Sequence, residues 1–482
     1  MLAALLAVAG CSTIDPGGTQ LGQPGGAPVP SVPPAAPRVI TPKPPVPVQN
    51  ARLIAMFGGA YEAPRAEALL NSILAKLAAA SDNPSQVYKV TLLNSPAVNA
   101  FALPSGDLFV TRGLLALAND SSEIAAVMAH EIAHVSLRHA FQREEAAKTE
   151  NLRGRVARNF QGKGRSEEIK ATGNLNLASF SRQQELEADR IGVRVISLAG
   201  YDPYGASRFL RSLGRSTAMR AALLGNRNSD EQPDILATHP STPQRIKLAI
   251  LAAREAGAPG IGNAGRDDYL AAIDGMDFGD DPADGFVRRR RFIHAKLGFS
   301  FITPPGFIME NSARVLIGRN NSGTQAIRFD SIQVDADKSL SEYISTGWIE
   351  GLKQDTIRSV TINGLPAATA SAEQGGWQFR VAVIRLGTDV YRLILADRTM
   401  SAGAERAFTD SINSFRRIPV AEARKLRALR IALVTAAPGD TPARLARNMA
   451  VAERNLDVFL LINGLSSGEK LQPGQKYKTI VE

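Results

Sequence analysis

The chain has 482 residues, of which 44% are apolar and 21% are charged, a composition typical of a folded globular protein and not of a disordered one. This length predicts about three domains. The formal net charge of +10 admits an anionic partner but does not bear on the fold. The single cysteine excludes an intrachain disulfide framework and a cysteine-based zinc finger, so a metal site must use His, Asp or Glu.

The amino terminus is typical of an exported protein. Residues 1–10 are apolar and end in small residues before Cys11, which predicts a signal peptide, and this run is too short to span a membrane. The segment around Cys11 resembles a bacterial lipobox, which implies a lipid on this cysteine and attachment to the membrane. Ser12, rather than Asp, follows the cysteine and implies delivery to the outer membrane. Residues 11–50 are rich in Pro and Gly, which predicts a lipidated tether.

Residues 51–259 are predicted to form a mainly helical domain with a small sheet. Apolar residues recur at helical spacing over 65–79 and 174–198, and they alternate as in strands over 88–93 and 107–111.

Three further segments complete the predicted organisation. Residues 260–287 are rich in Gly and Asp, which predicts a linker. Residues 288–418 combine β-rich runs with two helical patterns, as in a mainly antiparallel α+β module, whose role is unknown. Residues 430–482 form a small third unit. The predicted fold class is therefore α+β and multidomain.

One motif indicates the chemistry. His130-Glu131-Ile132-Ala133-His134 lies within an apolar helical run. At 3.6 residues per turn the two histidines share a helix face, where both imidazoles can bind one zinc ion with Glu131 beside it. Two histidines packed in a core are the alternative, but the pattern is rare by chance in a chain with five histidines. We therefore predict one Zn²⁺ per chain, bound by His130 and His134.

Catalytic zinc usually has three protein ligands, so a third is needed. On a continuous helix His139 is rotated by about 140° from His134, and we expect it to cap the helix end or to pack structurally. The metzincin spacing requires Gly and His where this chain has Leu and Ala, which excludes that class. Glu185 and Asp189 share a face of a later helix, while Glu187 is rotated by about 160° from Glu185. One of the first two can bind zinc while the other contacts a ligand histidine, and spacing alone does not decide which.

The segments H-E-I-A-H-V-x-x-R-H at 130–139 and S-R-x-x-E-x-E-A-D-x-x-G at 181–192 resemble a family of zinc endopeptidases. This gluzincin family includes HtpX, the CAAX prenyl protease and the periplasmic BepA-like proteases. The resemblance covers about residues 51–255, and it implies that Glu185 is the third zinc ligand and that Asp189 supports a ligand. Because no spanning helix is expected, the chain resembles the soluble periplasmic branch.

The resemblance also implies peptide-bond hydrolysis. Zinc supplies a Lewis acid, and Glu131 acts as general base. The strand residues Asn99, Ala100, Phe101 and Ala102 are expected to pair with an extended substrate by strand addition, with plain sheet structure as the alternative.

His239 and Arg245 match the family's His-Pro-x-x-x-x-Arg segment. Arg245 is expected to support the site from outside the ligand set. His239 has two functional interpretations besides a structural one: it donates a hydrogen bond to the oxyanion, or it binds zinc in the open position and keeps the enzyme latent. The polar segment 141–171 joins the two metal helices and is a candidate flap.

Residues 430–482 resemble a LysM module. Gly439-Asp440-Thr441 caps a first helix, Asn463-Gly464 closes a second, and Pro473-Gly474-Gln475 enters the last strand. The resemblance implies a βααβ unit that binds the glycan of peptidoglycan.

The basic run 288–291 follows four aspartates without aromatic interleaving, so we expect charge screening and no nucleic-acid partner.

The leading prediction is a zinc metalloendopeptidase of the bacterial cell envelope, an outer-membrane lipoprotein facing the periplasm. Its expected substrates are unfolded or extended polypeptides, namely misfolded or unassembled periplasmic and outer-membrane proteins. The alternative is a latent or non-proteolytic scaffold that bridges the outer membrane and peptidoglycan.

Overall fold

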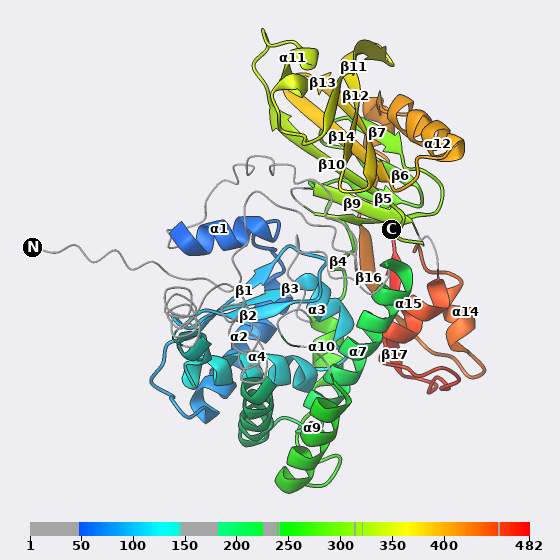
Figure 1. Cartoon of the computed structure of the whole chain (residues 1–482). Coiled ribbons are helices and arrows are strands. Elements are labelled where there is room, and N and C mark those ends of the chain that lie inside the picture. The colour runs from blue at the N-terminus through cyan, green and yellow to red at the C-terminus, as the bar shows by residue number, and fades with distance from the viewer. Residues whose placement is uncertain are drawn as a thin grey trace, which may run out of the picture.

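The computed structural model describes residues 48–143, 145, 182–224, 239, 242–312, 315–320, 322–451 and 454–482. They form an α+β protein in which a helical region with a small sheet precedes largely antiparallel sheets (Figure 1). The expected signal peptide, Cys11 and nearly all of the expected tether and flap lie outside the described residues. No helix in the described ranges has the length and apolar character needed to cross a membrane.

The helical region surrounds a small sheet. Its first elements are α1 (Val48–Met56), α2 (Pro64–Ala80), β1 (Lys89–Leu93), β2 (Ala100–Ala102), β3 (Asp107–Thr111), α3 (Arg112–Leu117) and α4 (Ser121–Ser136). A helix over residues 182–198, α7 (Gly205–Leu224), α9 (Pro243–Ala256) and α10 (Arg266–Ile273) follow. In α2, Leu70, Ile73 and Leu77 are buried at the predicted helical spacing.

The small sheet has the strand order β1-β3-β2. β1 pairs with β3 in parallel, and β2 pairs with β3 antiparallel, so β2 is an edge strand in the described part of the chain. β2 lies next to α4, and β1 lies next to α2 (Figure 1). One edge of the sheet therefore runs beside the helix that carries His130 and His134.

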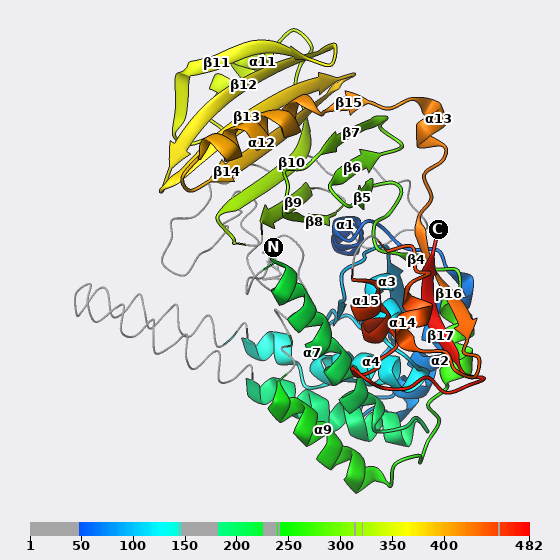
Figure 2. The ribbon, with the colours of Figure 1, turned by 90° about the vertical axis from the view of Figure 1, so that its right-hand side faces the viewer.

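Two antiparallel sheets make up the next region, which stands above the helical region in Figures 1 and 2. The four-stranded sheet has the order β15-β7-β6-β5 and contains β5 (Phe286–Arg288), β6 (Arg291–His294), β7 (Phe299–Ile302) and β15 (Arg416–Arg417). The seven-stranded sheet has the order β11-β12-β13-β14-β10-β9-β8 and contains β8 (Phe307–Asn311), β9 (Val315–Asn320), β10 (Gln325–Gln333), β11 (Leu352–Ile362), β12 (Leu365–Gln374), β13 (Trp377–Leu386) and β14 (Asp389–Asp397). The helices of this region are α11 (Leu340–Ser345), α12 (Ala402–Asn413) and α13 (Val420–Ala423). Phe299, Phe329 and Phe415 lie in a buried cluster of this region's own.

The carboxy-terminal unit shares both a sheet and a core with the helical region. It consists of β16 (Leu429–Thr435), α14 (Pro442–Ala446), α15 (Asn455–Ile462) and β17 (Lys476–Val481). β16 pairs antiparallel with β17 and with β4 (Asp277–Phe278). Ile431, Phe459 and Ile480 belong to the same buried cluster as residues of α2 and α4. The unit is therefore packed into the helical region and not joined to it only by a strand.

Lys478 of β17 attaches this unit to the carboxy-terminal end of α3, just before α4. Its buried ammonium group donates hydrogen bonds to the carbonyls of Ala116, at 2.8 Å, and Ala118. Burial lowers the pKa of Lys478 to about 7, and burial raises the pKa of Glu123 in the first turn of α4 to about 7. The start of α4 thus depends on contacts from a strand more than 350 residues later in the chain.

Segment 260–287 differs from the expected linker, because it contains α10. Tyr269, Leu270 and Ile273 are fully buried in the cluster shared with α4. The hydroxyl of Tyr269 donates to the carbonyl of Leu115. All the glycines of the segment lie outside α10, so the composition of the whole segment concealed its buried helix.

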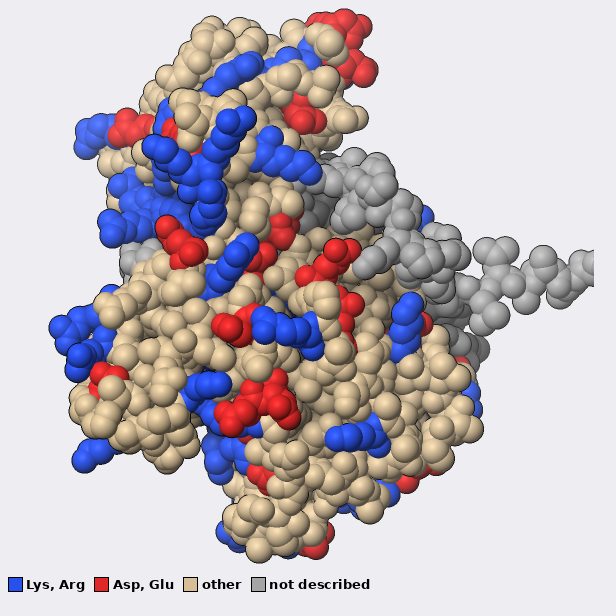
Figure 3. All heavy atoms as spheres, turned by 180° about the vertical axis from the view of Figure 1, so that it is seen from behind, with Lys and Arg blue, Asp and Glu red and all other residues tan. Residues whose placement is uncertain are grey.

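The surface charge is unevenly distributed. On the face seen in Figure 3, Lys and Arg gather over the upper part, and charges of both signs mix below. The basic run 288–291 has partners within the chain: Arg291 pairs with Glu422 at 2.6 Å, and Arg290 donates to the carbonyl of Thr303 at 2.8 Å.

Candidate metal centre

Helix α4 is buried along nearly its whole length. Asp120 caps its first turn by accepting a hydrogen bond from the Glu123 backbone at 2.9 Å, and every residue from Ser121 to His134 is buried. The helix therefore holds the zinc-binding motif within the core, where packing restricts the histidine rotamers.

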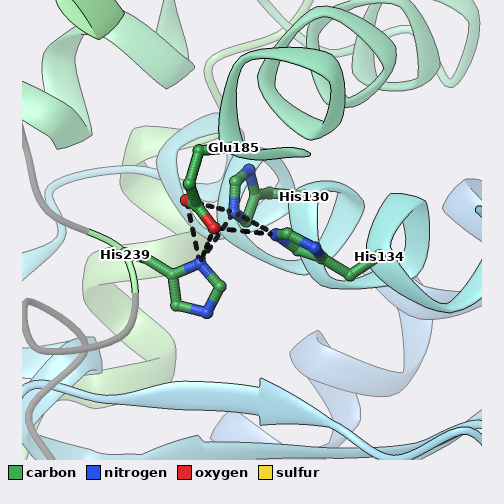
Figure 4. Close-up of side chains that lie close together, drawn as sticks. All are labelled: His130, His134, Glu185 and His239. Carbon is green, nitrogen blue, oxygen red and sulfur yellow. Dashed lines mark hydrogen bonds and ion pairs between the residues drawn. The ribbon is translucent and has the colours of Figure 1, made fainter. Parts of the chain in front are cut away.

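Four potential ligand atoms converge in one buried cluster (Figure 4). One ligand atom each from His130, His134, Glu185 and His239 lies within 4.8 Å of the others. The two Nε2 atoms of His130 and His134 are 3.0 Å apart, and each lies 3.4 Å from an oxygen of Glu185. His239 points its Nδ1 at Glu185, 2.8 and 2.9 Å from the two carboxylate oxygens.

The donor atoms and the electrostatics of this cluster fit zinc. Imidazole nitrogens and a carboxylate oxygen are ligands that zinc takes. Burial lowers the pKa of His130, but contacts with Asp189 and Glu185 outweigh it and raise this pKa to about 10. Burial raises the pKa of Glu185, but hydrogen bonds from three histidines hold it well below its usual value. Burial holds the pKa of His134 well below its usual value, as a neutral ligand requires. The chain thus carries an intact zinc site, formed by His130, His134 and Glu185 together with His239.

Gly192 allows the two metal helices to approach each other closely. A Cβ atom at this position would lie 3.3 Å from the backbone nitrogen of His130 and 3.4 Å from its Cα. Because such contacts are tighter than ordinary packing, a side chain here would push the helix over residues 182–198 away from α4. The small residue therefore helps to bring Glu185 opposite the two histidines.

Asp189 and Arg245 lie next to the ligands. Asp189 Oδ1 is 3.0 Å from Nδ1 of His130. Arg245, in the first turn of α9, donates to both oxygens of Asp189 at 2.7 Å and lies 3.1 Å from Glu185. Burial raises the pKa of Asp189, but hydrogen bonds from Arg245 and His130 lower it to about 2. The arginine thus holds Asp189 in its charged form and also contacts Glu185.

Glu131 projects into the site beside the ligands. Its Oε1 is buried and has no hydrogen-bond partner among the described residues, and it lies 3.8 Å from Nε2 of His239. A buried oxygen without a partner is costly, and this one is open to a water molecule or a substrate.

His139 contacts a zinc ligand, which the sequence analysis missed. Its Nδ1 lies 2.8 Å from Nδ1 of His134. The rotation of about 140° assumed a continuous helix, but α4 ends at Ser136 and Arg138 adopts a left-handed backbone with φ 56°. This turn brings His139 back to the helix. The Leu137-Arg138-His139 segment contained no signal for the turn, because arginine has no preference for positive φ.

The expected substrate strand borders the site. Ala100, Phe101 and Ala102 form β2, the edge strand beside α4, and pair with β3 on one side only in the described part of the chain. Asn99 is buried and its backbone nitrogen donates to the Thr111 hydroxyl at 3.0 Å. The strand therefore presents an edge near the zinc ligands.

Known proteins are similar to this chain over part of its length. Residues 64–251 match Peptidase family M48. The Beta-barrel assembly-enhancing protease of Escherichia coli K12 is 30% identical over 212 residues, which are 42% of this chain and 42% of that protein. The Mitochondrial metalloendopeptidase OMA1 of Arabidopsis thaliana is 35% identical over 164 residues, 33% of this chain and 30% of that protein. The chain thus spans less than half the length of these curated relatives.

Solved structures add no fold assignment. The solution structure of cyanobacterial PsbP from Synechocystis aligns with 29% of this chain and 98% of that chain, at 12% identity and a TM-score of 0.23, which is too low to assign a fold.

The matched residues 64–251 contain the entire ligand set, with both histidines of the motif, the glutamate of the later helix and His239. This part of the chain is similar to Peptidase family M48 and carries the zinc-ligand set of a metalloendopeptidase.

Proposed function

We propose that this protein is a zinc-dependent endopeptidase of the bacterial cell envelope that cleaves misfolded or unassembled envelope proteins. The observation that carries the proposal is a buried ligand set beside Glu131 Oε1, an oxygen that has no hydrogen-bond partner among the described residues. A zinc ion in this set supplies a Lewis acid for peptide-bond hydrolysis.

The protein's own residues divide the remaining tasks. Glu131 takes the proton of the attacking water and passes it to the leaving amine. Asp189 and Arg245 hold His130 and Glu185 in place through the contacts at 2.7 to 3.1 Å. β2 pairs with the backbone of an extended substrate, which favours unfolded chains over compact ones and makes cleavage largely independent of sequence.

The envelope location rests on the sequence and on the relatives. The lipobox-like segment at Cys11 supports lipid anchoring in the outer membrane. The name of the Escherichia coli relative links that protein to β-barrel assembly, which supports a periplasmic role here. The strand–helix–helix–strand order of residues 429–481 supports a LysM-like unit that binds peptidoglycan, to be tested by sedimentation with purified peptidoglycan.

His239 keeps the enzyme latent. Its Nδ1 belongs to the ligand cluster, in the place that catalytic zinc sites keep open. Of its two interpretations, this geometry favours a fourth ligand over an oxyanion donor. A scaffold role that needs no cleavage is the second candidate, because a site closed by four ligands fits it equally well.

Cleavage of unfolded casein by zinc-loaded protein tests the proposal. We expect chelation to abolish cleavage, added zinc to restore it, and Glu131→Gln to remove it without loss of bound zinc. Because the wild type is proposed to be latent, the assay includes His239→Ala. If neither the zinc-loaded wild type nor zinc-loaded, folded His239→Ala cleaves casein over hours at micromolar concentrations, the scaffold function replaces the enzyme.

A further inference from the structure

The second ring nitrogen of the zinc ligand His134 has an unusual neighbour. Its Nε2 faces the ligand cluster, 3.0 Å from Nε2 of His130. Its Nδ1 points the other way and lies 2.8 Å from Nδ1 of His139. Zinc-binding histidines generally donate this second N–H to a carboxylate, a backbone carbonyl or water. Here another imidazole takes that place.

The surrounding backbone holds His139 in position. The side chain is 1% exposed, and the left-handed turn at Arg138 sets its direction. The carbonyl of His139 accepts a hydrogen bond from Gln184 at 3.3 Å. Gln184 precedes the ligand Glu185 on the second metal helix, so His139 contacts both metal helices. This attachment to two elements distinguishes it from a residue at a frayed helix end.

Zinc binding by His134 determines which ring nitrogens of His134 and His139 carry protons. A His134 that binds metal through Nε2 carries its proton on Nδ1, which therefore donates to Nδ1 of His139. His139 must then carry its own proton on Nε2. That nitrogen faces the Glu187 carboxylate, with 3.7 Å between Nε2 and Oε2. The order from surface to metal site is Glu187, His139, His134.

We propose that His139 and Glu187 are positioning residues that fix the tautomer and the ring orientation of the zinc ligand His134. His139 acts as the acceptor for the His134 N–H, and the negative charge of Glu187 favours the tautomer of His139 that can accept it. Glu187 is the one carboxylate of the E-x-E-A-D segment that is rotated away from Glu185 on the helix. The proposed contact with His139 gives this residue a function at the zinc site. The inference rests on the zinc site of the proposed function but not on cleavage.

Zinc affinity measured by competition with a chromophoric chelator tests the inference without any substrate. His139→Leu keeps the volume but removes the acceptor, so we expect the Kd for zinc to rise about 10- to 100-fold. His139→Asn places an amide oxygen near the position of the lost Nδ1, and it should restore affinity to within about threefold of the wild type. Glu187→Gln should fall between the wild type and His139→Leu. Glu255→Gln, at an exposed carboxylate of α9, is the matched control and should change nothing.

Two results would overturn the inference. The first is a zinc Kd of His139→Leu within twofold of the wild type. The second is an equal loss in His139→Asn and His139→Leu, which would assign His139 a packing role. If His139→Leu does not fold, the other two variants decide. A zinc Kd near the wild-type value for His139→Asn, together with a higher Kd for Glu187→Gln, would support the inference. An unchanged Kd for Glu187→Gln would contradict it. The absorption spectrum of the cobalt-loaded protein gives a second measure of ligand geometry. A protein that binds zinc as expected here but never cleaves casein would refute the proposed function and leave this inference standing.

Discussion

Replacing His239 with alanine is the most direct test of latency. The ring contributes Nδ1 to a cluster in which all ligand atoms lie within 4.8 Å, and it lies 3.2 Å from Nε2 of His130. Alanine removes this ligand atom and leaves the three that a catalytic zinc site needs. We therefore expect His239→Ala to bind zinc more weakly and to cleave faster than the wild type.

The size of the effect follows from the ligand count. A four-ligand structural zinc site contributes about 10–16 kcal/mol, or roughly 2.5–4 kcal/mol for each ligand if the four contribute equally. Because 1.4 kcal/mol corresponds to about a tenfold change, opening the fourth position can raise the cleavage rate by at most about 60- to 700-fold. An increase of at least about tenfold would establish latency.

The assay follows fluorescent casein fragments at saturating zinc, with metal content measured on the same samples. His294→Ala is the matched control, because His294 is equally buried but belongs to β6 of the sheet region; it should not activate. The double variant His239→Ala with Glu131→Gln should be inactive. A fall in cleavage by His239→Ala with full zinc content would refute latency and support the oxyanion interpretation instead.

Four further predictions concern metal binding and stability. Asp189 and Glu185 raise the pKa of His130 to about 10, so zinc must displace a proton from this ring to bind. The Kd for zinc should therefore fall about tenfold for each pH unit between about pH 6 and pH 9. A pH-independent Kd in chelator competition would contradict this. Gly192→Leu should force the metal helices apart at a cost of about 1–3 kcal/mol, visible as lower zinc affinity and a lower melting temperature, whereas unchanged values would show that the helices do not need this close approach. Phe459→Ala should destabilise the helical region by about 3–5 kcal/mol, because this fully buried ring belongs to the core that the region shares with the carboxy-terminal unit. If the melting temperature of the zinc-dependent unfolding transition does not change, the carboxy-terminal unit folds independently. Arg392→Met should remove the arginine that pairs with the buried Asp330 at 2.7 Å and leave only the contact of Asp330 with Arg328 at 3.2 Å. We expect a cost of up to about 3–5 kcal/mol in the sheet region alone, so a simultaneous loss of zinc binding would contradict this.

The zinc ligands were accessible from sequence because their spacing is local. His130 and His134 are one helical turn apart, and the same holds for Glu185 and Asp189. Local periodicity then places each pair on one helix face whatever the rest of the fold does. Spacing alone could not say which carboxylate binds the metal; the resemblance to known endopeptidases did, and in the structure Glu185 faces both histidines.

The contact between His139 and His134 escaped prediction for an equally physical reason. The helical rotation was correct for a continuous helix, but one residue in the left-handed region, Arg138, redirects the chain after α4. Backbone reversals of this kind in non-glycine residues carry little sequence signal. His139 lies only five residues after the ligand His134. Its position was nevertheless harder to predict than those of Asp189 and Arg245.

Sequence alone determined the α+β class, the presence of a zinc site and its two histidine ligands, because these depend on local periodicity and side-chain chemistry. The choice of Glu185 as third ligand came from the resemblance to known endopeptidases. Tertiary structure decided how far the catalytic region extends. The segment that composition indicated as a linker contributes a buried helix, and the carboxy-terminal unit contributes Lys478 and Phe459 to the surroundings of α4. Such contacts join residues hundreds of positions apart. In a single sequence, an apolar helix face that packs within its own unit has the same local pattern as one that packs against a neighbouring unit.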